Sequence, residues 1–177
     1  MSGYTLRDFQ VTAKAAVLHE FETARSVLMV AATGTGKTTT AIAIAEEFLH
    51  HGRVLVCVHR YELAMQFIKR FHDMLGIVCD VEMADLHVKK YFQDQARVVV
   101  ATVQTLCSRG GRMEVFNPQD YALLITDEAH HSTSATHRRV IDYFKQNASL
   151  KHLGMTATPD RAMKPTALAT FRVFPLR

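Results

Sequence analysis

The sequence predicts an α/β domain built on a doubly wound, mainly parallel sheet. Five short apolar runs are continuous rather than alternating, which is typical of strands that are buried on both faces. Stretches with helical periodicity lie between these runs, and strands that alternate with helices favour this fold class. The five expected strands span residues 27–32, 54–58, 98–103, 122–125 and 150–155.

The expected helices follow from the spacing of the apolar residues. The first opens at Thr5, where Thr5 and Asp8 have the spacing of a capping box. Its apolar side carries Leu6, Phe9, Ala13, Ala16 and Val17. The other expected helices span residues 38–50, 62–75 and 135–146. A sixth strand at 77–83 stays open, because its pattern is mixed.

The size and composition fit a single globular domain. The chain has 177 residues, of which 48% are hydrophobic and 21% are charged. A chain of this length buries roughly 70% of its extended surface, so it needs no disulfides for stability. Its three cysteines, Cys57, Cys79 and Cys107, are widely spaced, which argues against disulfides and zinc. We therefore expect a reducing, cytoplasmic location, and the lack of a long apolar run predicts no membrane span.

The net charge is compatible with a polyanionic partner. Lysine and arginine number 21 against 17 aspartate and glutamate, a formal charge of +4. Such an excess suits a nucleic acid without requiring one, and ordinary solvated charge explains it equally well.

The first expected strand runs directly into a glycine-containing loop and then a helix. The loop reads Ala31-Ala-Thr33-Gly34-Thr35-Gly36-Lys37-Thr38. Glycines allow backbone N–H groups to turn toward phosphates, and the following helix N-terminus favours an anion. Lys37 would then reach the β- and γ-phosphates, and Thr38 would bind Mg²⁺. Ala31 replaces the usual first glycine, and the alternative is a structural turn with a surface lysine.

Two adjacent carboxylates follow the fourth expected strand. Asp127 and Glu128 come directly after residues 122–125 and Thr126. Ligands of parallel sheets bind at the carboxyl ends of strands. Asp127 would hold Mg²⁺, and Glu128 would position or deprotonate the water that attacks the γ-phosphate. Alone, such a pair is equally typical of a helix start.

Together these segments resemble motifs of the superfamily two helicases of the DEAH type. The loop at 31–38, the box at 127–130 and the segment 154–161 resemble motifs I, II and III. Segments 58–66 and 101–106 are similar to motifs Ia and Ib, and 6–10 to an adenine-reading element. The details are closer to the phage and restriction-enzyme branch than to the RNA-directed branch. The resemblance implies a P-loop NTPase domain of the RecA-like type, with DNA favoured over RNA.

The resemblance also implies roles for individual residues. ATP and Mg²⁺ would be the cofactors, with Lys37, Asp127 and Glu128 catalytic and with Thr38 and Asp127 at the metal. Nucleotide-binding residues would be Arg7, Gln10, Thr33, Gly34, Thr35, Gly36, Lys37, Thr38 and Thr39. His130, Thr156 and Thr158 would couple the nucleotide to the nucleic acid. The nucleic-acid backbone would be contacted by Arg60, Gln66, Thr102, Gln104 and Thr105.

The resemblance further implies a second domain that would supply an arginine finger. Residues 1–161 would be the first helicase domain, and residues 162–177 an exit segment toward the missing second domain. An arginine finger contributes about 10³- to 10⁵-fold to turnover in related phosphoryl transfer, so the chain alone would hydrolyse ATP weakly. A partner chain or further sequence would complete it.

Two alternatives to a nucleic-acid-dependent ATPase remain open. The chain could be a truncated module, a remnant helicase half that binds ATP and DNA without hydrolysis. A small-molecule kinase would also use a phosphate loop, but an acceptor pocket and lid arginines would be expected instead of the second and third motifs. Polarity of movement, strandedness and oligomeric state are not predicted.

Overall fold

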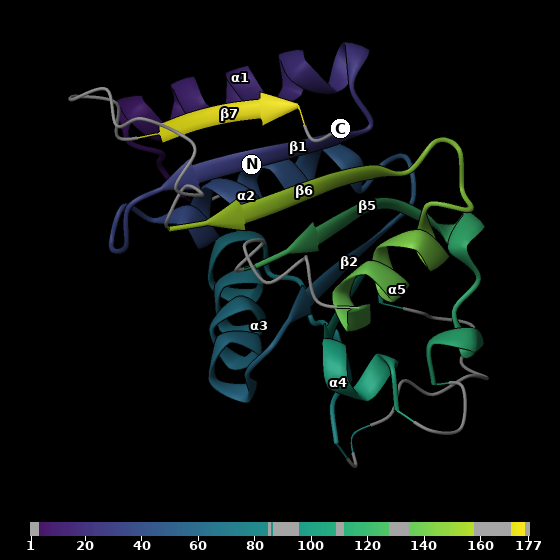
Figure 1. The fold of residues 1–177 in the computed structure, drawn as a ribbon. Coiled ribbons are helices and arrows are strands. Elements are labelled where there is room, and N and C mark those ends of the chain that lie inside the picture. Colours follow the sequence, from purple (N-terminus) through teal and green to yellow (C-terminus); the bar gives the residue numbers. More distant parts are fainter. Residues whose placement is uncertain are drawn as a thin grey trace.

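The computed structural model describes residues 4–84, 86, 96–108, 112–127, 135–157 and 171–175. These residues form a seven-stranded sheet in the order β3-β4-β2-β5-β6-β1-β7 (Figure 1). All its pairings are parallel except that of β7, which runs antiparallel to β1 at one edge. The predicted fold class, a doubly wound and mainly parallel sheet, is confirmed.

The strands lie where continuous apolar runs predict them. They are β1 (Ser26–Ala31), β2 (Arg53–Val58), β3 (Asp80–Glu82), β4 (Val98–Thr102), β5 (Tyr121–Thr126), β6 (Lys151–Thr156) and β7 (Phe171–Pro175). Each of the five expected strands ends within one residue of its expected limits, and the open candidate at 77–83 is the short strand β3.

The helices flank the sheet on both faces. They are α1 (Asp8–Thr23), α2 (Lys37–Phe48), α3 (Tyr61–Leu75), α4 (Val103–Leu106) and α5 (Ala135–Phe144). Two short 3₁₀ helices, η1 (Arg112–Val115) and η2 (Pro118–Asp120), precede β5. None of the helices in the described ranges is long and apolar enough to cross a membrane.

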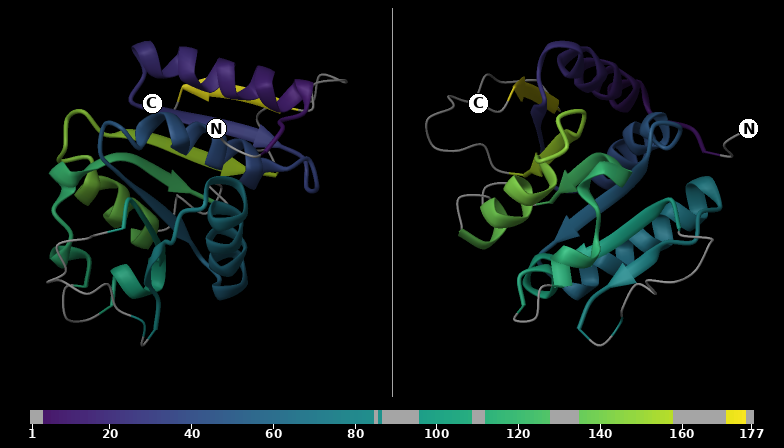
Figure 2. Two further views of the ribbon diagram at one scale, coloured as in Figure 1. Left: turned by 180° about the vertical axis from the view of Figure 1, so that it is seen from behind. Right: turned by 90° about the vertical axis from the view of Figure 1, so that its right-hand side faces the viewer.

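Two hydrophobic cores lie on opposite faces of the sheet. Helices α1, α2 and α3 cover one face, and α4, η1 and α5 cover the other (Figure 2). In β2, Val54 and Val56 enter the first core, whereas Leu55 and Cys57 enter the second. Because alternate residues of one strand are buried in two cores, the strand sequence is apolar throughout.

The N-cap of helix α1 lies two residues later than the predicted cap at Thr5. It is Arg7, and the backbone N–H of Arg7 donates to Oε1 of Gln10 at 3.0 Å. A glutamine at the third helical position can satisfy this N–H as in a capping box. The Thr5 cap is therefore wrong, and Leu6 lies before the helix rather than on its apolar side.

The expected exit segment contributes an edge strand. Residues of β7 pair with residues 27–31 of β1, with Leu28 opposite Phe174 and Met29 opposite Val173. The described part of 162–177 thus packs on the sheet. The division of the chain at residue 161 stays a prediction.

A buried histidine makes the stability of the fold depend on pH. His152 of β6 is 3% exposed, and its Nε2 lies 2.9 Å from Oγ1 of Thr126. Burial, with a smaller contribution from Lys145, lowers the pKa of His152 to about 3. The neutral ring is thus the form that the folded protein holds at physiological pH.

We therefore expect the free energy of unfolding to decrease as the pH is lowered past about 6.5. Below this pH the histidine is protonated in the unfolded chain but stays neutral in the folded protein. Between about pH 6 and pH 4, His152 lowers the free energy of unfolding by about 1.4 kcal/mol for each unit of decrease in pH. Above about pH 6.5 it causes no such loss. Urea unfolding of the wild type and His152→Gln across this range measures the difference. Parallel pH profiles for the two proteins would contradict the expectation.

Candidate nucleotide-binding site

The loop between β1 and α2 adopts the backbone that its glycines allow. Gly34 and Gly36 have φ of 82° and 83°, in the left-handed region that side chains disfavour. Gly36 is the N-cap residue of the 12-residue helix α2, so the amino end of this helix faces the loop. Ala31, the departure from the usual motif, lies inside β1, is 2% exposed and has no positive φ. That position therefore does not require glycine in this fold.

The side chain of Lys37 contacts the loop that precedes it. Its Nζ donates to the carbonyl of Ala31 at 2.9 Å and to that of Ala32 at 3.4 Å. The hydroxyl of Thr35 also donates to the Ala32 carbonyl, at 2.7 Å. The ammonium is thus held at the loop by neutral carbonyl acceptors. An anion could draw it away, since charge-assisted hydrogen bonds are roughly twice as strong.

Gln10 connects the start of α1 to the same loop. Its side chain is 5% exposed, and Nε2 lies 3.4 Å from the carbonyl oxygens of both Thr35 and Gly36. Arg7 is exposed, with its guanidinium carbon 6.0 Å from the centre of the Phe9 ring. The structure therefore places Gln10 beside the loop, whereas Arg7, the other predicted adenine contact, is exposed at the start of the same helix.

This packing predicts different effects for two alanine substitutions. A Cβ at Gly36 would lie 2.5 Å from Nε2 of Gln10, whereas one at Gly34 would meet nothing within 4 Å. Both carry the left-handed conformation, which costs about 1–2 kcal/mol for a side chain. We expect Gly36→Ala to lower the free energy of unfolding more than the matched control Gly34→Ala, as measured by urea unfolding. Equal losses would contradict the Gln10 contact.

A cleft of about 620 Å³ brings the loop together with Asp127 and α3. From the loop and α2 it is lined by Thr33, Gly34, Gly36, Lys37, Thr38 and Thr39. From α3 it is lined by Leu63, Gln66, Lys69, Arg70 and Asp73. Asp127 follows β5, is 8% exposed and donates its backbone N–H to the Cys57 carbonyl at 3.2 Å.

The cleft contains oxygen ligands that suit a hard cation. Asp127, a carboxylate residue, and Thr38, a hydroxyl residue, line the same cavity although they are 89 positions apart in sequence. Oxygen ligands of this kind are those that Mg²⁺ prefers. The two predicted metal-binding residues are therefore brought together with Lys37.

Helix α3 contributes polar residues that the motifs did not identify. Lys69 and Asp73 form an ion pair at 2.9 Å, and the hydrogen bond from Lys69 lowers the pKa of Asp73. Arg70 lies beside them in the cleft. Gln66 and Arg70 are four residues apart, and this spacing places them on one helix face. This four-residue spacing was the feature of the sequence from which the position of Arg70 could have been predicted. Gln66 itself, predicted to contact nucleic acid, lines the loop cleft.

Three predicted site residues, Glu128, His130 and Thr158, lie outside the described residues. Thr156 is the last residue of β6 and is 2% exposed, at the same edge of the sheet as the loop.

The predicted nucleic-acid contacts divide into exposed and buried residues. Arg60 is exposed immediately before α3, and exposed Gln104 of α4 donates Nε2 to the carbonyl of His59 at 3.1 Å. These two residues therefore lie together at the carboxyl ends of β2 and β4. Thr102 and Thr105 are 8% and 7% exposed, and their hydroxyls bond to each other at 2.8 Å.

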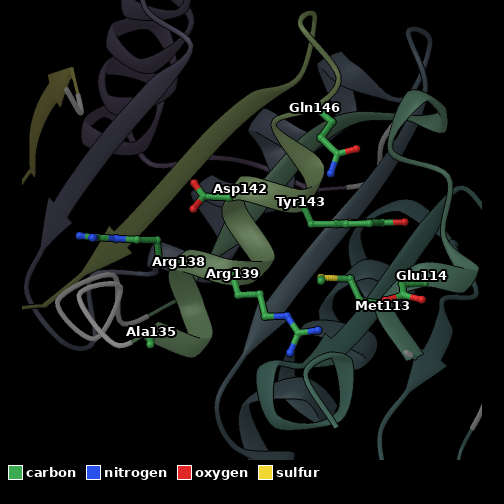
Figure 3. A pocket seen from close by; sticks show the side chains of 8 residues that line it. All are labelled: Met113, Glu114, Ala135, Arg138, Arg139, Asp142, Tyr143 and Gln146. Carbon is green, nitrogen blue, oxygen red and sulfur yellow. The ribbon is translucent and has the colours of Figure 1, made fainter. Parts of the chain in front are cut away.

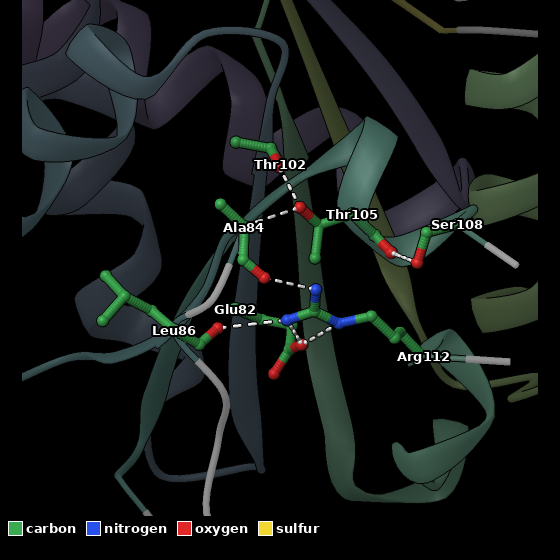
Figure 4. A network of polar contacts seen from close by, with 7 residues as sticks. All are labelled: Glu82, Ala84, Leu86, Thr102, Thr105, Ser108 and Arg112. Carbon is green, nitrogen blue, oxygen red and sulfur yellow. Dashed lines mark hydrogen bonds and ion pairs between the residues drawn. The ribbon is translucent and has the colours of Figure 1, made fainter. Parts of the chain in front are cut away.

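The hydroxyl of Thr105 belongs to a polar network at the β3 edge (Figure 4). The backbone N–H of Ala84 donates to it at 3.1 Å, and Ala84 has a left-handed φ of 45°. Arg112 donates to the Ala84 carbonyl at 2.5 Å and to the Leu86 carbonyl at 3.2 Å. Its Nε donates to Glu82, which is 2% exposed, at 2.7 Å. Thr105 thus joins this turn to α4, and Arg112 joins it to η1.

A second cleft, of about 610 Å³, lies between η1 and α5 (Figure 3). It is lined by Met113, Glu114, Ala135, Arg138, Arg139, Asp142, Tyr143 and Gln146. Its charged side chains are of both signs, and none of the predicted site residues that the structure describes lines it.

The fold is that of a RecA-like helicase domain, and the chain belongs to a known family. Residues 3–161 match the family described as type III restriction enzyme, res subunit. Among solved structures, the helicase domain of Hef from Pyrococcus furiosus has a TM-score of 0.73 at 24% identity, over 87% of this chain and 33% of that one. The restriction-modification enzyme LlaGI, solved in complex with a DNA substrate mimic, has a TM-score of 0.65 at 23% identity, over 88% and 18%.

A curated relative points the same way. The chain is 31% identical over 170 residues to irc3 of Schizosaccharomyces pombe, whose name designates a mitochondrial ATP-dependent helicase. That alignment covers 89% of this chain and 26% of the relative. The chain therefore spans about a quarter of the length of this relative. The predicted resemblance to the first domain of superfamily two helicases and to restriction-enzyme subunits is confirmed.

Proposed function

We propose that this chain is the ATP-binding and ATP-hydrolysing domain of a nucleic-acid-dependent helicase or translocase. The observation that carries the proposal is the cleft in which Lys37, Thr38 and Asp127 meet. A cation, a hydroxyl and a buried carboxylate beside a helix N-terminus are the groups that a nucleoside triphosphate with Mg²⁺ needs. The family of the chain supports this assignment.

Each residue would have a defined part in the reaction. Lys37 would leave its two carbonyl acceptors and hold the phosphates, together with the N–H groups of the loop and α2. Asp127 and Thr38 would hold Mg²⁺, which neutralises charge on the phosphates when bound. Glu128 would orient the attacking water. Gln10 would give up its long hydrogen bonds to the carbonyls of Thr35 and Gly36 and read the adenine edge, since a carboxamide is both donor and acceptor.

DNA is the proposed polymer, and a second domain is proposed to complete the enzyme. LlaGI, a structural neighbour, was solved with a DNA substrate mimic, and the family is that of restriction-enzyme subunits. The chain matches only a part of its curated relative irc3. An arginine finger and the other half of a nucleic-acid clamp would come from outside this chain. In the same proposal, residues 127–130 act as the DEAH box in ATP hydrolysis. His130, Thr156 and Thr158 couple the nucleotide to the nucleic acid.

Steady-state ATP hydrolysis tests the proposal. The purified chain is assayed with Mg²⁺, alone and with single-stranded DNA, duplex DNA or RNA, with Lys37→Ala as the blank. We expect weak hydrolysis that nucleic acid stimulates, and DNA more than RNA. Turnover equal to the blank under every condition would reject autonomous hydrolysis and favour a module that only binds ATP and DNA.

A further inference from the structure

Two large apolar side chains are exposed at the start of α3. Tyr61 is 54% exposed and Met65 is 42% exposed. They are four residues apart, so they lie on the same side of the helix. Among the described residues, Tyr61 has no hydrogen bond and no ring partner. Apolar residues scattered singly on a surface are normal, whereas a contiguous exposed apolar patch can mark an interaction site.

The surroundings of Tyr61 favour a nucleic-acid strand as the occupant. Arg60 precedes it and is exposed, and Gln104 is bound to the neighbouring His59 carbonyl at 3.1 Å. A guanidinium and a carboxamide donor can both contact phosphates, whereas an aromatic ring can stack on a base. Cationic and aromatic groups together are the features of proteins that bind single strands.

The charges around this surface also suggest how a strand would lie. Glu62 is exposed on the same turn and repels phosphate, whereas Arg60 attracts it. A strand would therefore place its phosphates at Arg60 and Gln104 and a base over Tyr61.

We propose that Tyr61 is a stacking surface for an unpaired base, extended by Met65, beside phosphate contacts at Arg60 and Gln104. This inference rests on the proposed function, because it assumes a nucleic-acid ligand at this edge of the sheet. It adds a substrate preference. A base stacked in a duplex does not offer its face to Tyr61, so the surface selects single strands over duplexes.

An oligonucleotide without bases separates stacking from phosphate binding. Binding of fluorescently labelled oligothymidylate, and of an abasic strand of the same length, is measured by anisotropy for the full chain. We expect Tyr61→Ala to weaken binding of oligothymidylate at least fivefold and binding of the abasic strand less than twofold. Tyr61→Phe should bind both strands like the wild type, since the phenyl ring still stacks. Arg60→Ala should weaken binding of the oligothymidylate and of the abasic strand to the same extent.

The controls address folding and the alternative occupants. Val11→Ala removes an apolar residue of α1 that is 52% exposed, and it should change neither affinity. Equal losses for both strands with Tyr61→Ala, or no loss for either, would overturn the stacking role. A wild-type dimer in sedimentation that Tyr61→Ala converts to a monomer would also overturn it, in favour of a second copy. If the wild type binds neither strand, nucleic-acid binding by this chain, and with it the proposed function, fails first.

Discussion

Replacing Lys37 by alanine is expected to abolish ATP turnover and to weaken ATP binding by about 10- to 150-fold. The range corresponds to one charged hydrogen bond, about 1.5–3 kcal/mol, because the ammonium would leave carbonyl acceptors for phosphate oxygens. Calorimetric titration with ATP and Mg²⁺ measures the change. Thermal unfolding should be almost unchanged, since within the described ranges Lys37 bonds only to the carbonyls of Ala31 and Ala32.

A second lysine provides the matched control for Lys37. Lys14 forms an ion pair with Glu47 at 2.5 Å, between α1 and α2 and not in the cleft. Lys14→Ala removes the same charge, so it should bind ATP as the wild type does. Equal weakening by both substitutions would show that net charge, and not the loop, determines affinity.

Replacing Arg112 by methionine is expected to cause the largest loss of stability. The side chain of Glu82 is 3% exposed, and Arg112 lies 2.5 Å from it. Breaking a buried ion pair by removing one partner is strongly destabilising, at a cost of about 3–5 kcal/mol. Domains of ordinary stability have only about 5–15 kcal/mol in total. Urea unfolding measures the loss.

Two further variants separate the cost of breaking this ion pair from other effects. Adding Glu82→Gln to Arg112→Met removes the buried charge, so the double variant should recover part of the stability. Lys69→Met breaks the ion pair with Asp73, in which the two side chains are 76% and 43% exposed, and it should cost far less stability than Arg112→Met. A loss below about 1 kcal/mol for Arg112→Met would contradict the buried network.

The strands were predictable because continuous burial leaves a direct pattern in the sequence. Residues 122–125 are apolar since β5 packs on both faces, and no tertiary information is needed to recognise them. The edge strand β7 was not predicted, because edge strands are less buried and Phe171–Pro175 contains a charge and a proline. The cap of α1 was misplaced at Thr5 instead of Arg7, because the sequence alone does not show which side chain, here that of Gln10, accepts from a free backbone N–H.

The site was predictable where neighbours in sequence carry the chemistry. The loop at Gly34 to Thr38 is local, so its residues could be named before the structure. Contacts between segments that are distant in sequence could not be predicted. Arg112 and Glu82 are 30 residues apart, and nothing in a single sequence marks them as a pair. The burial of Thr105 and the place of Gln66 in the cleft also depend on how strands and helices pack.

Binding of ATP to the intact 177-residue chain tests the central claim most directly. Titrations with Mg²⁺ compare the wild type, Lys37→Ala and Asp127→Asn, each with and without single-stranded DNA. The account predicts that the wild type binds ATP and that Lys37→Ala is at least tenfold weaker. Asp127→Asn should lose most of the dependence on Mg²⁺, and DNA should change ATP affinity by the same factor as ATP changes DNA affinity. Equal ATP affinity for all three proteins would contradict a nucleotide site at this loop.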